Sequence, residues 1–322
     1  MKNSYCSNLL NCISFHQKNV RFCTTLQVGE IISFYQEKPE ELAKKIQEIR
    51  ENIRTNLEKG IIPDGCNGCV HLEPYKEMQD FRINKITLNH YTQCNCACIY
   101  CTQGNRTFEK IKEDENKPVI YDVLKFINEL YDSDLIDKEK LYIDFQGGNI
   151  SCLKNHQEIV QMFLDRGVGT IYIPTNNIVY MPVIENLLKM KKGEVCTALD
   201  SGTKETYEKI KQVDKFDKSI ENLKRYVAIS NGNSIIVKYI IVNGYNDNMQ
   251  EFTLFMDKML EIGIKIIVLD IDYRDIIDGD FTIPKHYYEI VDYAKKICKE
   301  NNIDLGIPPY TRKVLEQGFS KK

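Results

Sequence analysis

The sequence predicts an α/β fold in which six strand–helix units build a mostly parallel sheet, and two observations support this. Strand-like and helix-like segments alternate from about residue 83 to residue 302. Several strand-like segments are nearly continuous runs of Val, Ile, Leu and Tyr, such as "SIIVKYIIVNG" (234–244), as expected for parallel strands buried on both faces. Six right-handed units of this kind form either an open doubly wound sheet or an incomplete barrel.

Each unit is identified by its periodicity and by the turn residues that bound it. The expected strands cover residues 83–89, 140–148, 169–177, 194–202, 234–244 and 265–272. The expected helices cover residues 118–131, about 154–166, about 181–191, 203–230, 248–262 and 286–302. The segments that follow the strands are polar and rich in Gly, Asn and Asp, and in both folds the active site lies at this edge of the sheet. Ordinary turns would explain each segment singly, but a cysteine-rich loop is one of them.

Length and composition restrict the class of protein. A chain of 322 residues with 43% hydrophobic and 28% charged residues has an ordinary globular composition. The net charge of −3 gives no reason to expect a nucleic acid as a partner. No apolar run approaches the roughly 18 residues that cross a bilayer, and the first residues are too polar for a signal peptide. We therefore expect a cytoplasmic protein without membrane or nucleic-acid partners.

The twelve cysteines are too many for chance in a reducing compartment, where they indicate metal ligation or redox chemistry rather than disulfides. Nine of them gather in two regions, an N-terminal one and the loop after the first expected strand, and Cys152, Cys196 and Cys298 are scattered. We expect three parts of the chain: a cysteine-rich α+β domain over 1–80, the βα series over 81–302 and a C-terminal tail over 303–322.

The loop "HYTQCNCACIYC" (90–101) carries Cys94, Cys98 and Cys101 with the spacing C-x3-C-x2-C. Three thiolates on a tight loop can ligate three irons of a [4Fe–4S] cluster and leave the fourth iron open. A zinc site normally has four protein ligands, which Cys96 or His90 would complete. The spacing alone leaves both alternatives open.

With Tyr100 before its last cysteine, this loop resembles that of the radical S-adenosylmethionine (SAM) enzymes, and the resemblance extends over roughly residues 83–300. "ALDSGTKETYEKIK" (198–211) resembles the family's "SLDG…YEKIR", and "VKYIIVNGYND" (237–247) resembles its fifth-strand segment, which packs against adenine. Further positions match motifs after the second, third and fourth strands: Gly147, Gly148, Asn149, Asn176, Asp200 and Lys211.

The resemblance implies a partial (β/α)6 TIM-type barrel that binds a [4Fe–4S] cluster and SAM. It places Gly147, Gly148 and Asn149 at the SAM amino group, Asp200 near the ribose and Lys211 at the carboxylate, with Tyr100 and Asn176 also at the cofactor. An electron from a reductant such as flavodoxin or ferredoxin would then cleave SAM to a 5′-deoxyadenosyl radical, which abstracts hydrogen from a substrate. Two positions depart from the family pattern, because Asn149 replaces an acidic residue and Lys211 replaces an arginine.

The N-terminal cysteines follow an order that resembles the SPASM or twitch module, an auxiliary-cluster domain of many radical SAM enzymes. A strand ending near Cys23, the segment "VGEII" (28–32), a helix over 39–59 and a Cys66-x-x-Cys69 turn occur in that order, although this domain precedes the barrel instead of following it. The resemblance implies a second [4Fe–4S] cluster on Cys6, Cys23, Cys66 and Cys69. A structural zinc on the same four residues is the alternative, and Cys12 is either a small buried residue or an alternative ligand.

The substrate is not encoded in any motif, and the catalytic residues beyond the cofactors are unknown. Cys152 is a candidate hydrogen donor or acid at the substrate pocket, with a core cysteine as the competing interpretation. Relatives with the auxiliary module modify peptides or proteins, and we expect a peptide or protein side chain as substrate. A sugar or another small metabolite is the alternative. A non-catalytic iron–sulfur or zinc protein is the rival of a different class.

Overall fold

The computed structural model describes residues 4–16, 19–23, 31–33, 38–64, 66–67, 69, 71–74, 82–101, 123–277 and 282–317. The first part of the expected "VGEII" strand, residues 28–30, and the start of the expected helix over 118–131 lie outside these residues. The chain forms two compact units that interleave along the sequence. Unit one comprises Met1–Gln93, Glu115–Gly148 and Leu153–Tyr172, and unit two comprises Cys94–Asp114, Asn149–Cys152 and Ile173–Lys322.

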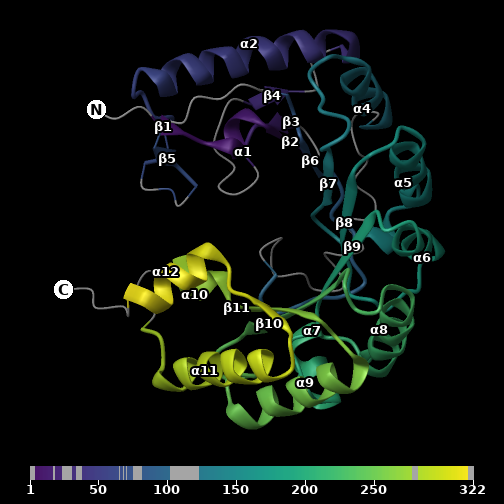
Figure 1. The fold of residues 1–322 in the computed structure, drawn as a ribbon, viewed down its shortest axis with the longest axis vertical. Coiled ribbons are helices and arrows are strands. Elements are labelled where there is room, and N and C mark those ends of the chain that lie inside the picture. Colours follow the sequence, from purple (N-terminus) through teal and green to yellow (C-terminus); the bar gives the residue numbers. More distant parts are fainter. Residues whose placement is uncertain are drawn as a thin grey trace. The chain divides into compact units, whose positions relative to one another are not determined.

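Unit one contains a sheet with the strand order β8-β7-β6-β2-β3-β4 (Figure 1). Its strands are β2 (Cys12–His16), β3 (Asn19–Arg21), β4 (Ile31–Ser33), β6 (Lys85–Asn89), β7 (Tyr142–Phe145) and β8 (Thr170–Pro174), the last of which continues into unit two. The N-terminal strand β2 pairs in parallel with β6, and β6, β7 and β8 are parallel as predicted. The N-terminal segment thus extends the sheet of the βα series.

The helices of unit one are α1 (Ser7–Leu10), α2 (Pro39–Glu58), α4 (Val123–Asp132) and α5 (His156–Asp165). Helix α2 begins at Pro39 and is followed by Gly60 in the left-handed region, which confirms the expected helix over 39–59. It packs against α4 (Figure 1). A second, two-stranded sheet pairs β1 (Ser4–Tyr5) with β5 (Glu73–Pro74) in antiparallel register.

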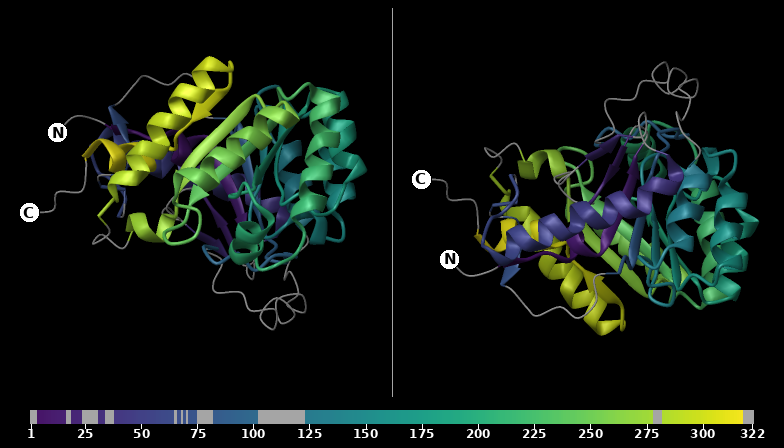
Figure 2. Two further views of the ribbon diagram at one scale, coloured as in Figure 1. Left: turned by 90° about the horizontal axis from the view of Figure 1, so that it is seen from below. Right: turned by 90° about the horizontal axis from the view of Figure 1, so that it is seen from above.

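Unit two contains the parallel strands β9 (Gly193–Ala198), β10 (Ile235–Ile241), β11 (Ile266–Ile271) and β12 (Asp304–Gly306) in the order β12-β11-β10-β9. Figure 2 shows the helices packed along the strands. The helical elements of unit two are η1 (Ile150–Cys152), α6 (Pro182–Lys189), α7 (Lys204–Lys211), α8 (Phe216–Ser230), α9 (Met249–Ile262), α10 (Tyr273–Ile277), α11 (Lys285–Glu300) and α12 (Pro309–Gln317).

Three details differ from the sequence-based expectation. The helical region 203–230 is two helices, because Gln212 adopts a left-handed conformation and caps α7. The segment after residue 302 is not only a tail, since β12 pairs in parallel with β11. Strand β10 is not buried on both faces: its side chains alternate between buried and half-buried, with Ile236, Lys238 and Ile240 half-buried. This alternation is expected when one face packs on helices and the other lines an accessible interior. None of the described helices combines the length and the apolar composition needed to span a membrane.

Candidate active site

The cysteine loop, residues 94–101, belongs to unit two and presents its predicted ligands at an accessible surface. Cys94, Cys98 and Cys101 are each half-buried, whereas Cys96 is 2% exposed. The Cys98–Cys101 turn is closed by a backbone hydrogen bond of 3.0 Å from the Cys101 amide to the Cys98 carbonyl. The three cysteines of the predicted motif therefore differ from the fourth cysteine in exposure.

The backbone of the loop is attached to α7 and α10. The amides of Ala97 and Ile99 donate to the carbonyls of Lys211 (3.2 Å) and Ile210 (3.0 Å), at the last turn of α7. The Ile99 carbonyl accepts a hydrogen bond of 2.6 Å from Nη1 of Arg274, so both polar groups of this residue are used.

Arg274 itself is fixed by a buried carboxylate. Its Nε lies 3.1 Å from both oxygens of Asp272, which is 2% exposed. This contact was not predictable from the sequence, because Arg274 lies 175 positions from Ile99.

A buried network of Tyr100, Asp200 and Lys211 links the loop to β9 and α7. The Tyr100 hydroxyl donates to the Asp200 carboxylate, and the Lys211 ammonium donates to the Tyr100 hydroxyl, each over 2.5 Å. Lys211 and Asp200 also form an ion pair, with side chains 2% and 0% exposed. Burial lowers the pKa of Lys211, but the Asp200 carboxylate, together with Cys98 and Tyr207, offsets this, so the pKa of Lys211 is raised on balance. Burial and the same carboxylate raise the pKa of the Tyr100 hydroxyl.

This network bears on two predicted SAM contacts. The charges of Asp200 and Lys211 neutralise each other within the protein, so neither side chain presents an uncompensated charge to a ligand. Their observed role is to hold the loop against α7. Contact of either residue with SAM stays a prediction.

Asp200 is positioned by β10 and by the turn that follows it. The backbone of Asp200 is in the left-handed region, with a φ of 60°. Its Oδ1 accepts a hydrogen bond of 2.7 Å from the Ile240 amide, and its carbonyl oxygen accepts one of 2.8 Å from Nδ2 of Asn246. Asn246 is fully buried, and its Oδ1 also accepts from the Val242 amide. Sequence reasoning noted the polar segment after this strand but did not single out Asn246.

Asn176 contacts the cysteine loop directly, and its contact with SAM stays a prediction. Its Nδ2 donates to Oδ1 of Asn95 (2.6 Å) and to the sulfur of Cys96 (3.1 Å). Hydrogen bonding with Cys94 and Cys98, together with burial, raises the pKa of the Cys96 thiol. The same contact with Cys96 lowers the pKa of Cys98, and the nearby Lys211 charge contributes in the same direction. Cys96 is thus a buried donor beside Cys98.

Asn149 and Cys152 lie at either end of η1. Oδ1 of Asn149 accepts from the amide (3.0 Å) and the hydroxyl (2.7 Å) of Ser151, and its Nδ2 lies 3.4 Å from the Thr175 hydroxyl. The side chain is 3% exposed and serves as a cap of this short helix. Cys152 is half-buried, which is compatible with either of its two interpretations.

Within unit one, Gly147 and Gly148 pack against the segment that leads into the loop. A Cβ at Gly148 would lie 1.9 Å from the Gln93 carbonyl oxygen, and one at Gly147 would lie 2.3 Å from the Tyr91 carbonyl oxygen. Gly147 also has a φ of +103°. The two glycines are therefore required by the close approach of two backbones, whatever they contact in SAM.

The predicted auxiliary ligands Cys6, Cys23, Cys66 and Cys69 line one small cavity in unit one, together with Asn8, Leu9, His71 and Leu72. We call it the cysteine cavity. The pairing of β1 with β5 brings Cys6 near the turn of Cys66 and Cys69, which is closed by a 3.0 Å backbone bond like that of Cys98–Cys101. The free space is about 10 Å³, which is near the minimum for one water molecule.

Two thiols of the cysteine cavity, Cys6 and Cys66, lie in an environment that disfavours their charged form. Burial raises the pKa of Cys66 to about 11, and the neighbouring thiols Cys23, Cys6 and Cys69 add to this. Burial also raises the pKa of Cys6, although backbone amides partly offset it. A bound cation is the usual means of stabilising several thiolates at such a position.

The donor sets of both regions fit the groups that the resemblance implies. Four cysteines around one cavity suit a zinc ion or a cluster, and three accessible cysteines on one loop suit a cluster with an open iron. Among the described residues, no three His, Cys, Asp or Glu side chains are already drawn around a single metal position.

The sequence of residues 88–259 matches the sequence pattern of the radical SAM superfamily. This range includes the cysteine loop, α7 and β10. The chain belongs to the radical SAM superfamily. The resemblance seen in the sequence is thereby confirmed at the level of the family, and the protein is a radical SAM enzyme whose exact reaction the match does not name.

Individual relatives are distant. The chain is 26% identical over 231 residues to a probable GTP 3′,8-cyclase of Saccharolobus islandicus, covering 71% of this chain and 68% of that protein. Its fold is similar to that of Streptococcus suis SuiB bound to S-adenosylmethionine, with a TM-score of 0.50, 13% identity and coverage of 82% of this chain and 56% of SuiB.

SuiB bound to the precursor peptide SuiA gives a TM-score of 0.50 at 11% identity over 89% of this chain and 70% of SuiB. The FeFe-hydrogenase maturase HydG of Carboxydothermus hydrogenoformans gives a TM-score of 0.51 at 14% identity, over 73% of this chain and 56% of HydG. The chain thus spans little more than half the length of some of its structural neighbours. These likenesses confirm the predicted α/β fold of the partial-barrel kind.

Proposed function

We propose that this protein cleaves SAM at a [4Fe–4S] cluster held by Cys94, Cys98 and Cys101 and abstracts hydrogen from a peptide or protein side chain. The observation that carries the first part is the cysteine loop, in which these three cysteines are accessible while Cys96 is buried. When bound, the cluster and SAM supply the radical chemistry. The protein holds the loop in place through Arg274 and through the buried Tyr100–Asp200–Lys211 network.

Anaerobic reconstitution with iron and sulfide, followed by reduction, tests this assignment. The wild-type protein is expected to convert SAM to 5′-deoxyadenosine, and Cys98→Ala is expected to reduce this to background because one iron ligand is lost. Cys69→Ala is the matched control in the other cysteine region and is expected to retain part of the activity. Full activity in Cys98→Ala, or an iron-free protein with zinc alone, would refute the proposal.

The substrate class is supported by the fold likeness to SuiB, whose structure contains a precursor peptide. The relationship to the GTP 3′,8-cyclase favours a nucleotide or another small metabolite as the second candidate. Formation of 5′-deoxyadenosine above the uncoupled rate distinguishes the two. We expect stimulation by synthetic peptides that together present every side chain, whereas stimulation by GTP alone would overturn the choice of a peptide.

We also propose that the cysteine cavity binds a second [4Fe–4S] cluster on Cys6, Cys23, Cys66 and Cys69, as in a SPASM-like module. The shared cavity supports this set of four ligands. Structural zinc remains the second candidate, because four cysteine thiolates are a complete ligand set for a tetrahedral zinc ion. Metal analysis decides: about eight irons per chain supports two clusters, and about four irons with one zinc supports the alternative.

A further inference from the structure

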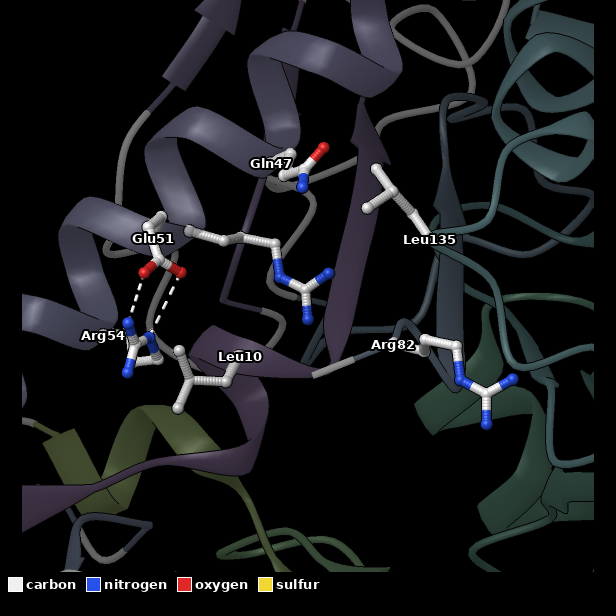
Figure 3. A pocket seen from close by; sticks show the side chains of 7 residues that line it. Leu10, Gln47, Glu51, Arg54, Arg82 and Leu135 are labelled. Atoms are coloured by element: carbon white, nitrogen blue, oxygen red, sulfur yellow. Dashed lines mark hydrogen bonds and ion pairs between the residues drawn. The ribbon is translucent and has the colours of Figure 1, made fainter. Parts of the chain in front are cut away.

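A cavity of about 230 Å³ lies against α2 in unit one (Figure 3). Figure 3 shows Arg54 bound to the carboxylate of Glu51, and Nη1 of this arginine also lies 2.7 Å from Glu58. These charges are therefore satisfied within α2 itself. The sheet of unit two differs from this cavity, because a charged pair on its accessible face keeps hydrogen-bonding groups that the described residues do not use.

Strands β10 and β11 of unit two turn one face toward their helices and leave the other partly accessible. On the first face, Tyr239 packs against Phe252 and Phe255 of α9, with ring centroids 4.9 and 4.7 Å away. We call the opposite, half-buried face the open face; it carries Ile236, Lys238, Ile240, Ile266, Val268 and Asp270. Parallel sheets normally have both faces covered, and an apolar surface with few polar groups is typical of a ligand site.

The open face carries one pair of charges. Nζ of Lys238 lies 3.6 Å from Oδ2 of Asp270, and the two side chains are 32% and 19% exposed. Oδ1 of Asp270 accepts hydrogen bonds from the Thr311 hydroxyl and the Ile271 amide. A separation of 3.6 Å is too long for a hydrogen bond. Within the described part of the chain, the ammonium and Oδ2 therefore have no hydrogen-bonding partner.

This pair lies close to the contacts that hold the cysteine loop. Lys238 is two residues from Ile240, whose amide donates to Asp200 of the buried network. Asp270 is two residues from Asp272, which fixes the arginine that binds the loop. Two residues of a strand span only about 7 Å. A ligand bound to the charged pair would therefore lie next to the candidate active site.

A donor and an acceptor side by side match the backbone of an extended peptide. In a paired strand, the N–H and the C=O of one residue face the same neighbour. The ammonium of Lys238 offers a donor to such a carbonyl, and Oδ2 of Asp270 offers an acceptor to such an N–H. The pair is neutral as a whole, so it suits a neutral peptide group better than a polyanion such as a nucleoside triphosphate.

We propose that the open face binds an extended segment of a peptide substrate, with one backbone carbonyl on Lys238 and the N–H of the same residue on Asp270. This inference rests on the proposed function, from which it takes a peptide as the substrate, and it adds the residues that hold the backbone. Contacts to the backbone position a peptide whatever side chains it carries, and the isoleucines and the valine of the open face contact its apolar groups.

Fluorescence anisotropy of a neutral, capped decapeptide with one tryptophan tests the proposal on the reconstituted full-length protein. The chain contains no tryptophan, so the signal comes from the peptide alone. We expect a dissociation constant on the order of 0.1 mM. The same peptide with N-methylated amides keeps its carbonyls but loses the donors for Asp270, and should bind at least about tenfold more weakly. No binding of the first peptide, or equal binding of both, would overturn the proposal.

Two variants assign the binding to the charged pair. Lys238→Met removes the donor, and Asp270→Asn replaces the acceptor with a donor while it keeps an oxygen for the Thr311 hydroxyl. Each is expected to weaken binding of the decapeptide about five- to tenfold. Lys258→Met is the matched control, since this side chain is also 32% exposed and lies 3.8 Å from Glu261 on α9. Unchanged affinity in both variants, or tighter binding to Asp270→Asn, would overturn the assignment.

Binding and turnover are measured separately, so the two proposals fail separately. Anisotropy needs no cleavage of SAM, and a wild-type protein that forms no 5′-deoxyadenosine would contradict the proposed function alone. A wild-type protein that cleaves SAM but does not bind the decapeptide would contradict the backbone contacts of the open face alone.

Discussion

The cysteine loop of unit two and the cysteine cavity of unit one are assembled in different ways. The loop cysteines lie within eight consecutive residues, and protein contacts from α7 and α10 hold the loop at Ile99. The cavity cysteines are spread over residues 6–69. The pairing of β1 with β5 brings Cys6 near Cys66 and Cys69, and Cys23 follows β3. Among the described residues of 63–72, the backbone hydrogen bonds join residues three positions apart.

The two regions also differ in their electrostatics. The hydrogen bond with Cys96 lowers the pKa of Cys98, and the nearby Lys211 charge adds to this, whereas burial and neighbouring thiols raise the pKa of Cys66. Neither Lys nor Arg is among the described residues that line the cysteine cavity. This difference teaches that the loop cysteines lie beside a cation of the protein itself, whereas the described lining of the cysteine cavity supplies none.

The largest effect is expected from Lys211→Met, which removes the cation that the loop has and the cavity lacks. It would leave the Asp200 carboxylate buried and unpaired, at a cost of about 3–5 kcal/mol in the free energy of unfolding. Urea denaturation measures this cost. The double variant with Asp200→Asn should recover most of it, and the exposed Lys209→Met is the control on the same helix. A Lys211→Met protein as stable as the control would contradict the buried network.

Gly148→Ala tests the close approach that places the start of the loop. The added Cβ would lie 1.9 Å from the Gln93 carbonyl oxygen, so the backbone next to Cys94 must shift. We expect this shift to lower the free energy of unfolding by about 1–3 kcal/mol and to cause loss of iron from the loop. Gly167→Ala is the matched control, because alanine would be strained at its φ of +77° but no atom lies within 4 Å of the added Cβ. We expect it to cost about 1 kcal/mol and to keep its iron. Equal iron content in Gly148→Ala and Gly167→Ala would show that the backbone next to Cys94 can shift without loss of iron from the loop.

Arg274→Gln sharpens the comparison by releasing one attachment of the loop alone. The hydrogen bond to the Ile99 carbonyl is charge-assisted, but the arginine side chain is 45% exposed. We therefore expect the free energy of unfolding to fall by only about 1 kcal/mol. The electron paramagnetic resonance spectrum of the loop cluster should change while the metal of the cavity is retained. Arg312→Gln, which loses an exposed bond to the Ile307 carbonyl, is the control. An unaltered spectrum would leave Arg274 with no role in positioning the loop.

The smallest effects are expected from the additional cysteine in each region. Cys12 is buried with a pKa raised to about 12 by burial, and Cys96 is a buried donor beside Cys98. Replacing either with alanine should cost about 1 kcal/mol or less and leave the metal content unchanged. Loss of metal from Cys12→Ala or Cys96→Ala would instead make that cysteine a ligand and change the assigned set in its region.

Much of the fold was predictable because its signals are local. Each of the six expected strands overlaps an observed one, for example 234–244 against Ile235–Ile241. The break between α7 and α8 was missed, since the left-handed Gln212 leaves no mark in the helical periodicity. The pairing of β2 with β6 and of β12 with β11 was missed because short strands carry little pattern.

The sequence by itself determined the family, the strand–helix alternation and the spacing of the three loop cysteines, since each depends on residues within a few turns of one another. Only the tertiary structure decided that Lys211 pairs with Asp200, that Arg274 reaches Ile99 and that four distant cysteines share one cavity. These contacts depend on the path of the chain between the partners, and the spacing of residues along a sequence does not specify that path.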